Sequence, residues 1–143
     1  MDNNLPTSGQ LERSLSQNIQ KLYRQELEHS PDKVTCQLFS NNLAIVIEDA
    51  ITAVEKILAS VDNQSDTALE LNTVINKSIE SKLKILVEEV LAVEVKDILF
   101  SSTFKTNQTG AIAILKQPPK VRNPYSIPKN KYQHQSQKEE TLR

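Results

Sequence analysis

The sequence predicts an α+β fold, a two-layer sandwich in which a four-stranded antiparallel sheet carries helices on one face. Three observations lead to this prediction. Some segments place apolar residues three or four positions apart, as helices do, whereas others alternate in the period-two pattern of strands. These segments follow one another in the order α-β-β-α-α-β-β. The 143 residues suffice for a single domain with one core.

The first unit is a helix followed by a hairpin. Apolar residues from Leu11 onward trace one helical face, and the helix should end near His29 because Pro31 disfavours helical geometry in the residue before it. Alternating runs at residues 34–38 and 43–47 flank a short Ser/Asn turn. This pattern predicts an antiparallel hairpin.

The second unit begins with two helices. Thr52 and Glu55 fit a capping box, which predicts a short helix at 53–60. A longer apolar stripe predicts a helix at 65–92, about 42 Å long at the standard rise. Strands of five to seven residues span only about 17–23 Å. The helix should therefore overhang the sheet, and self-association as a homodimer would cover its apolar end.

A second hairpin is predicted from the runs at 95–100 and 111–115, with Gly110 serving the backbone geometry between them. The triplet Leu-Phe-Ser occurs in both hairpins, at 38–40 and 99–101. Duplication of one unit and convergence of short apolar strands both explain this similarity, and the predicted architecture holds in either case.

The two ends differ from the body in composition. Residues 1–10 are expected to form a flexible arm, and residues 11–116 the single domain. Residues 117–143 contain four prolines, few apolar residues and no periodicity, which predicts a disordered tail. That tail carries a net charge of +4, whereas residues 1–116 carry −5. An acidic body argues against binding to a nucleic-acid duplex.

Composition also points to a location. The single cysteine precludes an intramolecular disulfide and fits a reducing compartment. The longest apolar runs, 43–47 and 111–115, are far shorter than the roughly 20 residues of a membrane span. The first ten residues lack the features of a signal peptide. We expect a cytoplasmic protein, and a peripheral position at a membrane is compatible with this composition.

The sequence contains no clear catalytic, metal or cofactor signature. Cys36 alternates with apolar residues and should be a buried, inert thiol. His29 falls at a helix end, where the helix dipole favours it, and His134 lies in the tail. Two histidines and one cysteine make a poor metal site, and phosphate-binding loops need more glycines than Gly9 and Gly110 supply. We therefore expect no metal, no cofactor and no enzymatic activity.

Two alternatives compete with this interpretation. Glu48, Asp49 and Glu55 lie around one strand-to-helix corner, where converging carboxylates would support acid-base catalysis. Capping by Glu55 is the simpler explanation. The basic tail, with Tyr125 and Tyr132 among its lysines and arginines, would suit a single-stranded nucleic-acid-binding module. A solubilising tail without a defined partner explains the same composition.

One stretch, "EDAITAVEKILA" at residues 48–59, resembles the MpsC-like family of small bacterial proteins, which includes YbcI-type proteins and was long a domain of unknown function. Thr52, Glu55 and Lys56 match the family's stretch after the first hairpin, whereas Ala50 and Ala53 replace its usual glycine and proline. The resemblance covers roughly residues 11–116. It implies the predicted element order.

The family takes its name from a Na+-translocating, membrane-potential-generating system linked to bicarbonate supply, in which this component is the soluble member. The resemblance therefore implies a non-enzymatic accessory or regulatory protein beside a membrane transporter subunit, and it carries over no catalytic residue. The candidate partner-binding residues lie at the corner and in the tail. They are Thr52, Glu55, Lys56, Lys120 and Arg122.

Overall fold

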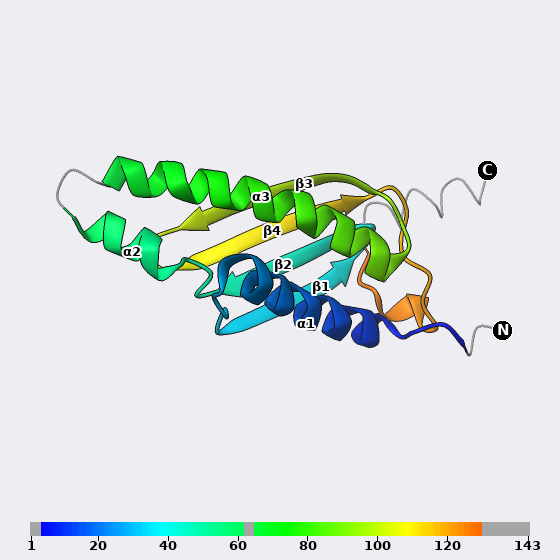
Figure 1. Ribbon diagram of the computed structural model, residues 1–143. Helices are drawn as coiled ribbons and strands as arrows, with labels where there is room; N and C mark the ends of the chain where they lie inside the picture. The colour runs from blue at the N-terminus through cyan, green and yellow to red at the C-terminus, as the bar shows by residue number, and fades with distance from the viewer. Residues whose placement is uncertain (1–3, 62–64, 130–143) are drawn as a thin grey trace.

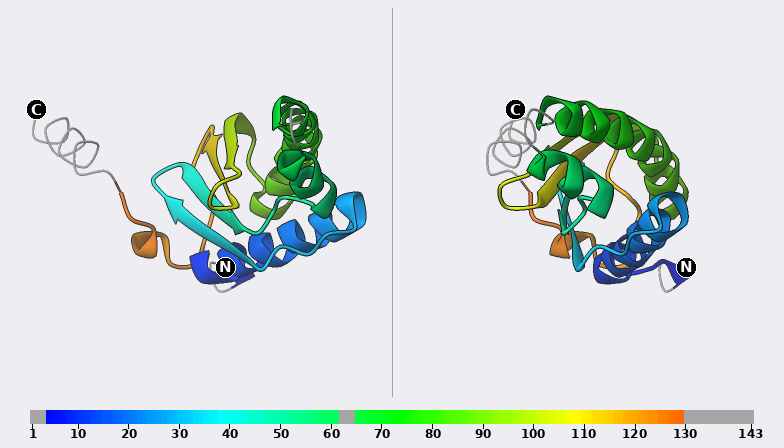
Figure 2. Two further views of the ribbon diagram at one scale, coloured as in Figure 1. Left: turned by 90° about the vertical axis from the view of Figure 1, so that its left-hand side faces the viewer. Right: turned by 60° about the vertical axis from the view of Figure 1, so that its left-hand side comes forward.

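The computed structural model describes residues 4–61 and 65–129. It confirms the predicted fold class: helices cover one face of a four-stranded antiparallel sheet (Figures 1 and 2). The strand order β1-β2-β4-β3 places the second strand of each hairpin at the centre. The elements are α1 (Ser8–Leu27), β1 (Lys33–Phe39), β2 (Asn42–Glu48), α2 (Ala53–Ser60), α3 (Ser65–Leu91), β3 (Val95–Thr103), β4 (Gln108–Leu115) and a 3-10 turn, η2 (Pro124–Ser126).

The core is aliphatic and lies between the sheet and the helices. Inward-facing residues of the central strands, such as Ile45 and Ala113, are fully buried against α1 and α3. From α1, Leu15 and Ile19 have no exposed surface. Burial of one such side chain contributes about 1.5–3 kcal/mol, so this layer supplies most of the stabilisation.

The first helix begins three residues earlier than predicted. Thr7 accepts a hydrogen bond from the backbone of Gln10, and the Gln10 side chain accepts one from the backbone of Thr7. This reciprocal cap starts the helix at Ser8, although Ser8 and its neighbours lack an apolar pattern. At the other end, Glu28 adopts a left-handed conformation with φ of 51° and ends the helix.

The second hairpin is longer than predicted because polar residues extend both strands. Ser102 pairs with Thr109 across β3 and β4, and their hydroxyl groups lie 2.7 Å apart. Gly110 sits within β4 rather than in the turn. The left-handed residue of that turn is Asn107, with φ of 50°. The expectation that Gly110 provides the special backbone geometry was therefore wrong.

The long helix α3 has 27 residues, about 40 Å at the standard rise, against roughly 30 Å for the nine residues of β3. Its first turns extend past the end of the sheet, as predicted (Figure 1), whereas Asn76, still in its N-terminal half, contacts Ser102 of β3. The shorter helix α2 packs against this half. A neighbouring element of the same chain therefore already contacts the overhang.

Residues 117–129, which the sequence pattern predicts to be disordered, pack against the open end of the sandwich; this segment is called the strap below. Val121 and Ile127 are buried in the core cluster. The backbone of Arg122 donates to Pro6 O, and Ser40 N donates to Pro128 O. Local composition cannot reveal these contacts, because each joins the strap to residues far away in the sequence. Residues 130–143 of the predicted tail lie outside the described residues.

Candidate functional site

A buried carboxylate lies where α2 begins. Glu55 is 1% exposed, and its Oε1 accepts hydrogen bonds from Thr52 N at 3.0 Å and from Thr52 Oγ1 at 2.8 Å. Its Oε2 accepts from Asn72 Nδ2, on α3, at 2.7 Å. All three donors are neutral groups. A buried carboxylate depends on such hydrogen bonds to remain inside an apolar core.

The hydrogen bonds continue from α3 into the sheet. Asn76 Nδ2 donates to Asn72 Oδ1 at 3.2 Å and to Ser102 Oγ at 2.9 Å, and Ser102 contacts the buried hydroxyl of Thr109. We call the set Thr52, Glu55, Asn72, Asn76, Ser102 and Thr109 the polar network. It fixes α2, α3 and the second hairpin to one another through directional contacts.

Tyr23 connects α1 electrostatically to the same region. It is 1% exposed. Burial, and after it the negative charge of Glu55, raises the pKa of Tyr23 far above the ordinary range of a phenol. Its hydroxyl therefore stays protonated at neutral pH.

A second group of contacts closes the corner between β2 and α2. Asn107 Nδ2 donates to Asp49 Oδ1 at 2.6 Å, and Ile51 N donates to Asn107 Oδ1 at 3.1 Å. Lys56 forms an ion pair with the same Asp49 carboxylate at 3.2 Å. His29 Nε2 lies 2.6 Å from Asp49 O, and because a carbonyl oxygen only accepts, this nitrogen donates.

The carboxylates of this corner have separate partners. Asp49 is held by Asn107 and Lys56, whereas Glu55 is held by Thr52 and Asn72. Acid-base catalysis at the corner would need two carboxylates that face one pocket, whereas these two carboxylates are each held by different partners. It favours a structural role for both groups.

The predicted partner-binding residues do not form one site. Thr52, Glu55 and Lys56 lie together at the start of α2, where Lys56 is exposed but the Glu55 side chain is buried. Lys120 and Arg122 belong to the strap, at the opposite end of the molecule in Figure 1. Arg122 is held there, since its Nε donates to Leu5 O at 3.1 Å.

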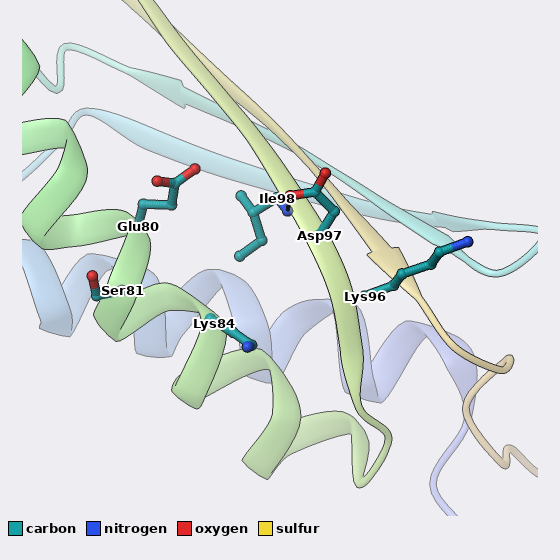
Figure 3. A pocket seen from close by; sticks show the side chains of 6 residues that line it. All are labelled: Glu80, Ser81, Lys84, Lys96, Asp97 and Ile98. Atoms are coloured by element: carbon teal, nitrogen blue, oxygen red, sulfur yellow. Dashed lines mark hydrogen bonds between the residues drawn. The ribbon is translucent and has the colours of Figure 1, made fainter.

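A groove between α3 and β3 could not be predicted from the sequence. It consists of two hollows of about 330 and 260 Å³, both lined by Glu80. Asn76 and Ser102 of the polar network line the larger one. Figure 3 shows the smaller one, in which Ile98 of β3 points toward α3 whereas Lys96 points away from it. The groove depends on how the helix lies over the strand, which local sequence patterns do not specify.

The cysteine is buried, as predicted. Cys36 is 7% exposed, and burial raises the pKa of its thiol to about 11, although a hydrogen bond from Ser16 acts in the opposite direction. Across the described ranges, no three His, Cys, Asp or Glu side chains come together as a metal site requires.

The thiol should be unreactive in the folded protein. A rise in the pKa from 9.0 to about 11 lowers the thiolate fraction at neutral pH by about 100-fold, so we expect alkylation by iodoacetamide at pH 7.5 to be at least that much slower than in 6 M guanidinium chloride. Because the folded-state pKa is the higher one, this group's contribution to stability is complete below pH 9 and is lost as the pH rises toward 11. Equal labelling rates in the two conditions would contradict the burial of Cys36.

An apolar stripe on α2 faces away from the core. Val54 and Ile57 lie on α2, Val61 is its C-cap residue with an extended backbone, and the three side chains are 59%, 62% and 49% exposed. We call these three residues the α2 stripe. An amphipathic helix normally buries its apolar face, so an exposed stripe of this kind marks a surface suited to contact with another molecule.

Within residues 4–61 and 65–129, no helix combines the length and the hydropathy that a membrane span requires. Together, the fold and the corner define a small two-layer α+β protein in which a buried carboxylate anchors the second helix. The sequence model of the family described as "Na+-translocating membrane potential-generating system (MpsC)" matches residues 7–117. The chain belongs to this MpsC family. No curated protein and no solved structure matches the chain.

Proposed function

We propose that this protein is a non-enzymatic accessory subunit of a Na+-translocating, membrane-potential-generating system, acting as a homodimer at the cytoplasmic face of the membrane. The observation that carries the proposal is the family match over residues 7–117. The state of the two side chains that could otherwise act in catalysis supports a non-enzymatic role. The Cys36 thiol stays protonated because its pKa is about 11, and the Glu55 carboxylate is engaged by Thr52 and Asn72.

The α2 stripe is the proposed docking surface for the membrane subunit. Its three side chains are aliphatic and exposed, so burying them against an apolar surface of the partner would contribute to binding. The helix that carries them is fixed at its start by the Thr52–Glu55 capping box and by the Lys56–Asp49 ion pair. A rigid helix loses little entropy when it binds.

This proposal predicts that Ile57→Asp abolishes docking. A carboxylate in the centre of an apolar contact would be desolvated without a partner, and we expect at least a 100-fold loss of affinity for the purified membrane subunit of the system. Binding would be measured by titration with that subunit in detergent or nanodiscs. Cells lacking the protein and complemented with the variant should show a reduced Na+-dependent membrane potential in a dye assay.

Ile85→Asp is the matched control, because Ile85 is also an exposed isoleucine (57%) but lies on α3. The control should bind as the wild type does. The docking surface would be wrong if both variants bound normally, and the proposed function would be wrong if the unmodified protein failed to bind the membrane subunit.

A further inference from the structure

The face of the sheet opposite the helices has an apolar centre. Inward and outward side chains alternate along the strands, and on the outward side Ala44 of β2, Ile112 of β4 and Leu99 of β3 lie next to one another in register. Val46 and Leu99 are 46% and 57% exposed. We call the residues Ala44, Val46, Leu99, Ile112 and Ile114 the outer sheet face. In both views of Figure 2 the helices lie on the other side of the sheet.

Polar side chains surround this apolar centre. Thr35 and Gln37 occupy the middle outward positions of the edge strand β1, between Lys33 and Phe39, and Asp97 and Ser101 are exposed on β3. An apolar centre within a polar rim is the usual composition of a protein–protein interface. An antiparallel sheet with a solvated outer face would instead show polar residues at its central strands.

We propose that a second copy of this chain packs on the outer sheet face, giving a two-fold symmetric pair of sheets. Pairing through the strand edges is disfavoured, because side-chain carboxylates occupy edge amides on both outer strands. Glu12 Oε2 accepts from Leu38 N of β1 at 2.7 Å, and Asp97 Oδ1 accepts from Ile98 N of β3 at 2.8 Å. The apolar face remains the surface through which two copies can associate.

The charges on this face are compatible with such a pair. Lys33 of β1 and Glu48 of β2 lie beside each other in register at the end of the sheet where β3 finishes. Asp97 lies near the diagonally opposite corner, where β3 begins. A two-fold axis along or across the strands therefore places each charge against an uncharged position of the other copy.

The area of the face indicates weak, reversible association. Four strands about 4.8 Å apart, each spanning roughly 23 Å, offer about 450 Å² per copy, or roughly 900 Å² in the pair. This lies below the 1,200–2,000 Å² of stable complexes, in the range of transient ones. The inference rests on the homodimer part of the proposed function and names its interface. It uses a different surface from the α2 stripe, so experiments can reject either proposal while the other holds.

The experiment is sedimentation equilibrium of the full chain between about 5 and 500 µM. The weight-average mass should rise from the monomer value of 16.1 kDa toward twice that value. Leu99→Lys and Val46→Lys should each raise the dissociation constant at least tenfold. Val74→Lys is the matched control, because Val74 is an exposed valine (65%) on α3, and it should associate as the wild type does.

Three results would overturn the inference: a wild-type protein that stays monomeric throughout, association that survives both sheet variants, or equal weakening by Val74→Lys. A chain ending at Lys129 tests whether residues 130–143, rather than a second copy, occupy the outer sheet face. If this chain dimerises at least tenfold more tightly than the full chain, the remaining residues 130–143 compete for the face, and a second copy is not its main occupant. Circular dichroism confirms that each variant is folded.

Discussion

Asn72→Asp is expected to lower the free energy of unfolding at pH 7 by about 3 kcal/mol or more, because it places a second carboxylate against Glu55 in a buried setting. In the wild type Asn72 Nδ2 donates to Glu55 Oε2 at 2.7 Å, whereas two carboxylates at that distance must share a proton. The double variant Glu55→Gln/Asn72→Asp should recover most of the loss, because the glutamine amide then donates to the new carboxylate.

Urea denaturation of the two single variants and the double variant measures this coupling. The deficit of Asn72→Asp should shrink as the pH falls from 7 toward about 4 and should be smallest below that, because a proton shared by the two carboxylates in the folded state is released by the unfolded chain until the pH reaches the ordinary carboxyl pKa of about 4. Thr73→Asp is the matched control: it adds a carboxylate one position along the same helix, at an exposed site, and should change stability by less than about 0.5 kcal/mol. Additive losses in the double variant would show that Glu55 and position 72 do not interact.

Truncation after Lys116 should cost about 2–4 kcal/mol, because it removes the strap from the open end of the core. Val121 and Ile127 are buried in the core, and burial of one such side chain contributes about 1.5–3 kcal/mol. The truncation also removes Asn123, whose Oδ1 accepts from Ser8 N at 2.9 Å in the first turn of α1. The measurement is the urea midpoint and slope.

A chain truncated after Lys129 keeps all of these contacts and serves as the control, with an expected midpoint equal to that of the full chain. In the full chain, Ile127→Asp should destabilise strongly, whereas Tyr125→Asp should not, because Tyr125 is 97% exposed although it lies in the same segment. Equal stability of the two truncated chains would mean that the strap contributes nothing to folding.

The contacts of helix α2 show which interactions could be predicted from nearby residues and which could not. The sequence predicted the capping box from the spacing of Thr52 and Glu55, and the structure confirms it, because a capping box forms between residues three positions apart. The prediction did not include Asn72, which is 17 positions from Glu55. Asn72 and Asn76 of α3 carry the polar network into the sheet through contacts of this long-range kind.

The amino-acid sequence by itself determined the order of elements, the antiparallel sheet, the aliphatic core and the buried thiol, because hydrophobic periodicity and capping act over a few residues. Only the tertiary structure decided that the strap is packed, that Glu55 is satisfied within the protein, and that the α2 stripe and the outer sheet face are exposed. Each of these features depends on which distant residues meet, and a local pattern can show that a side chain is apolar but not whether another element covers it.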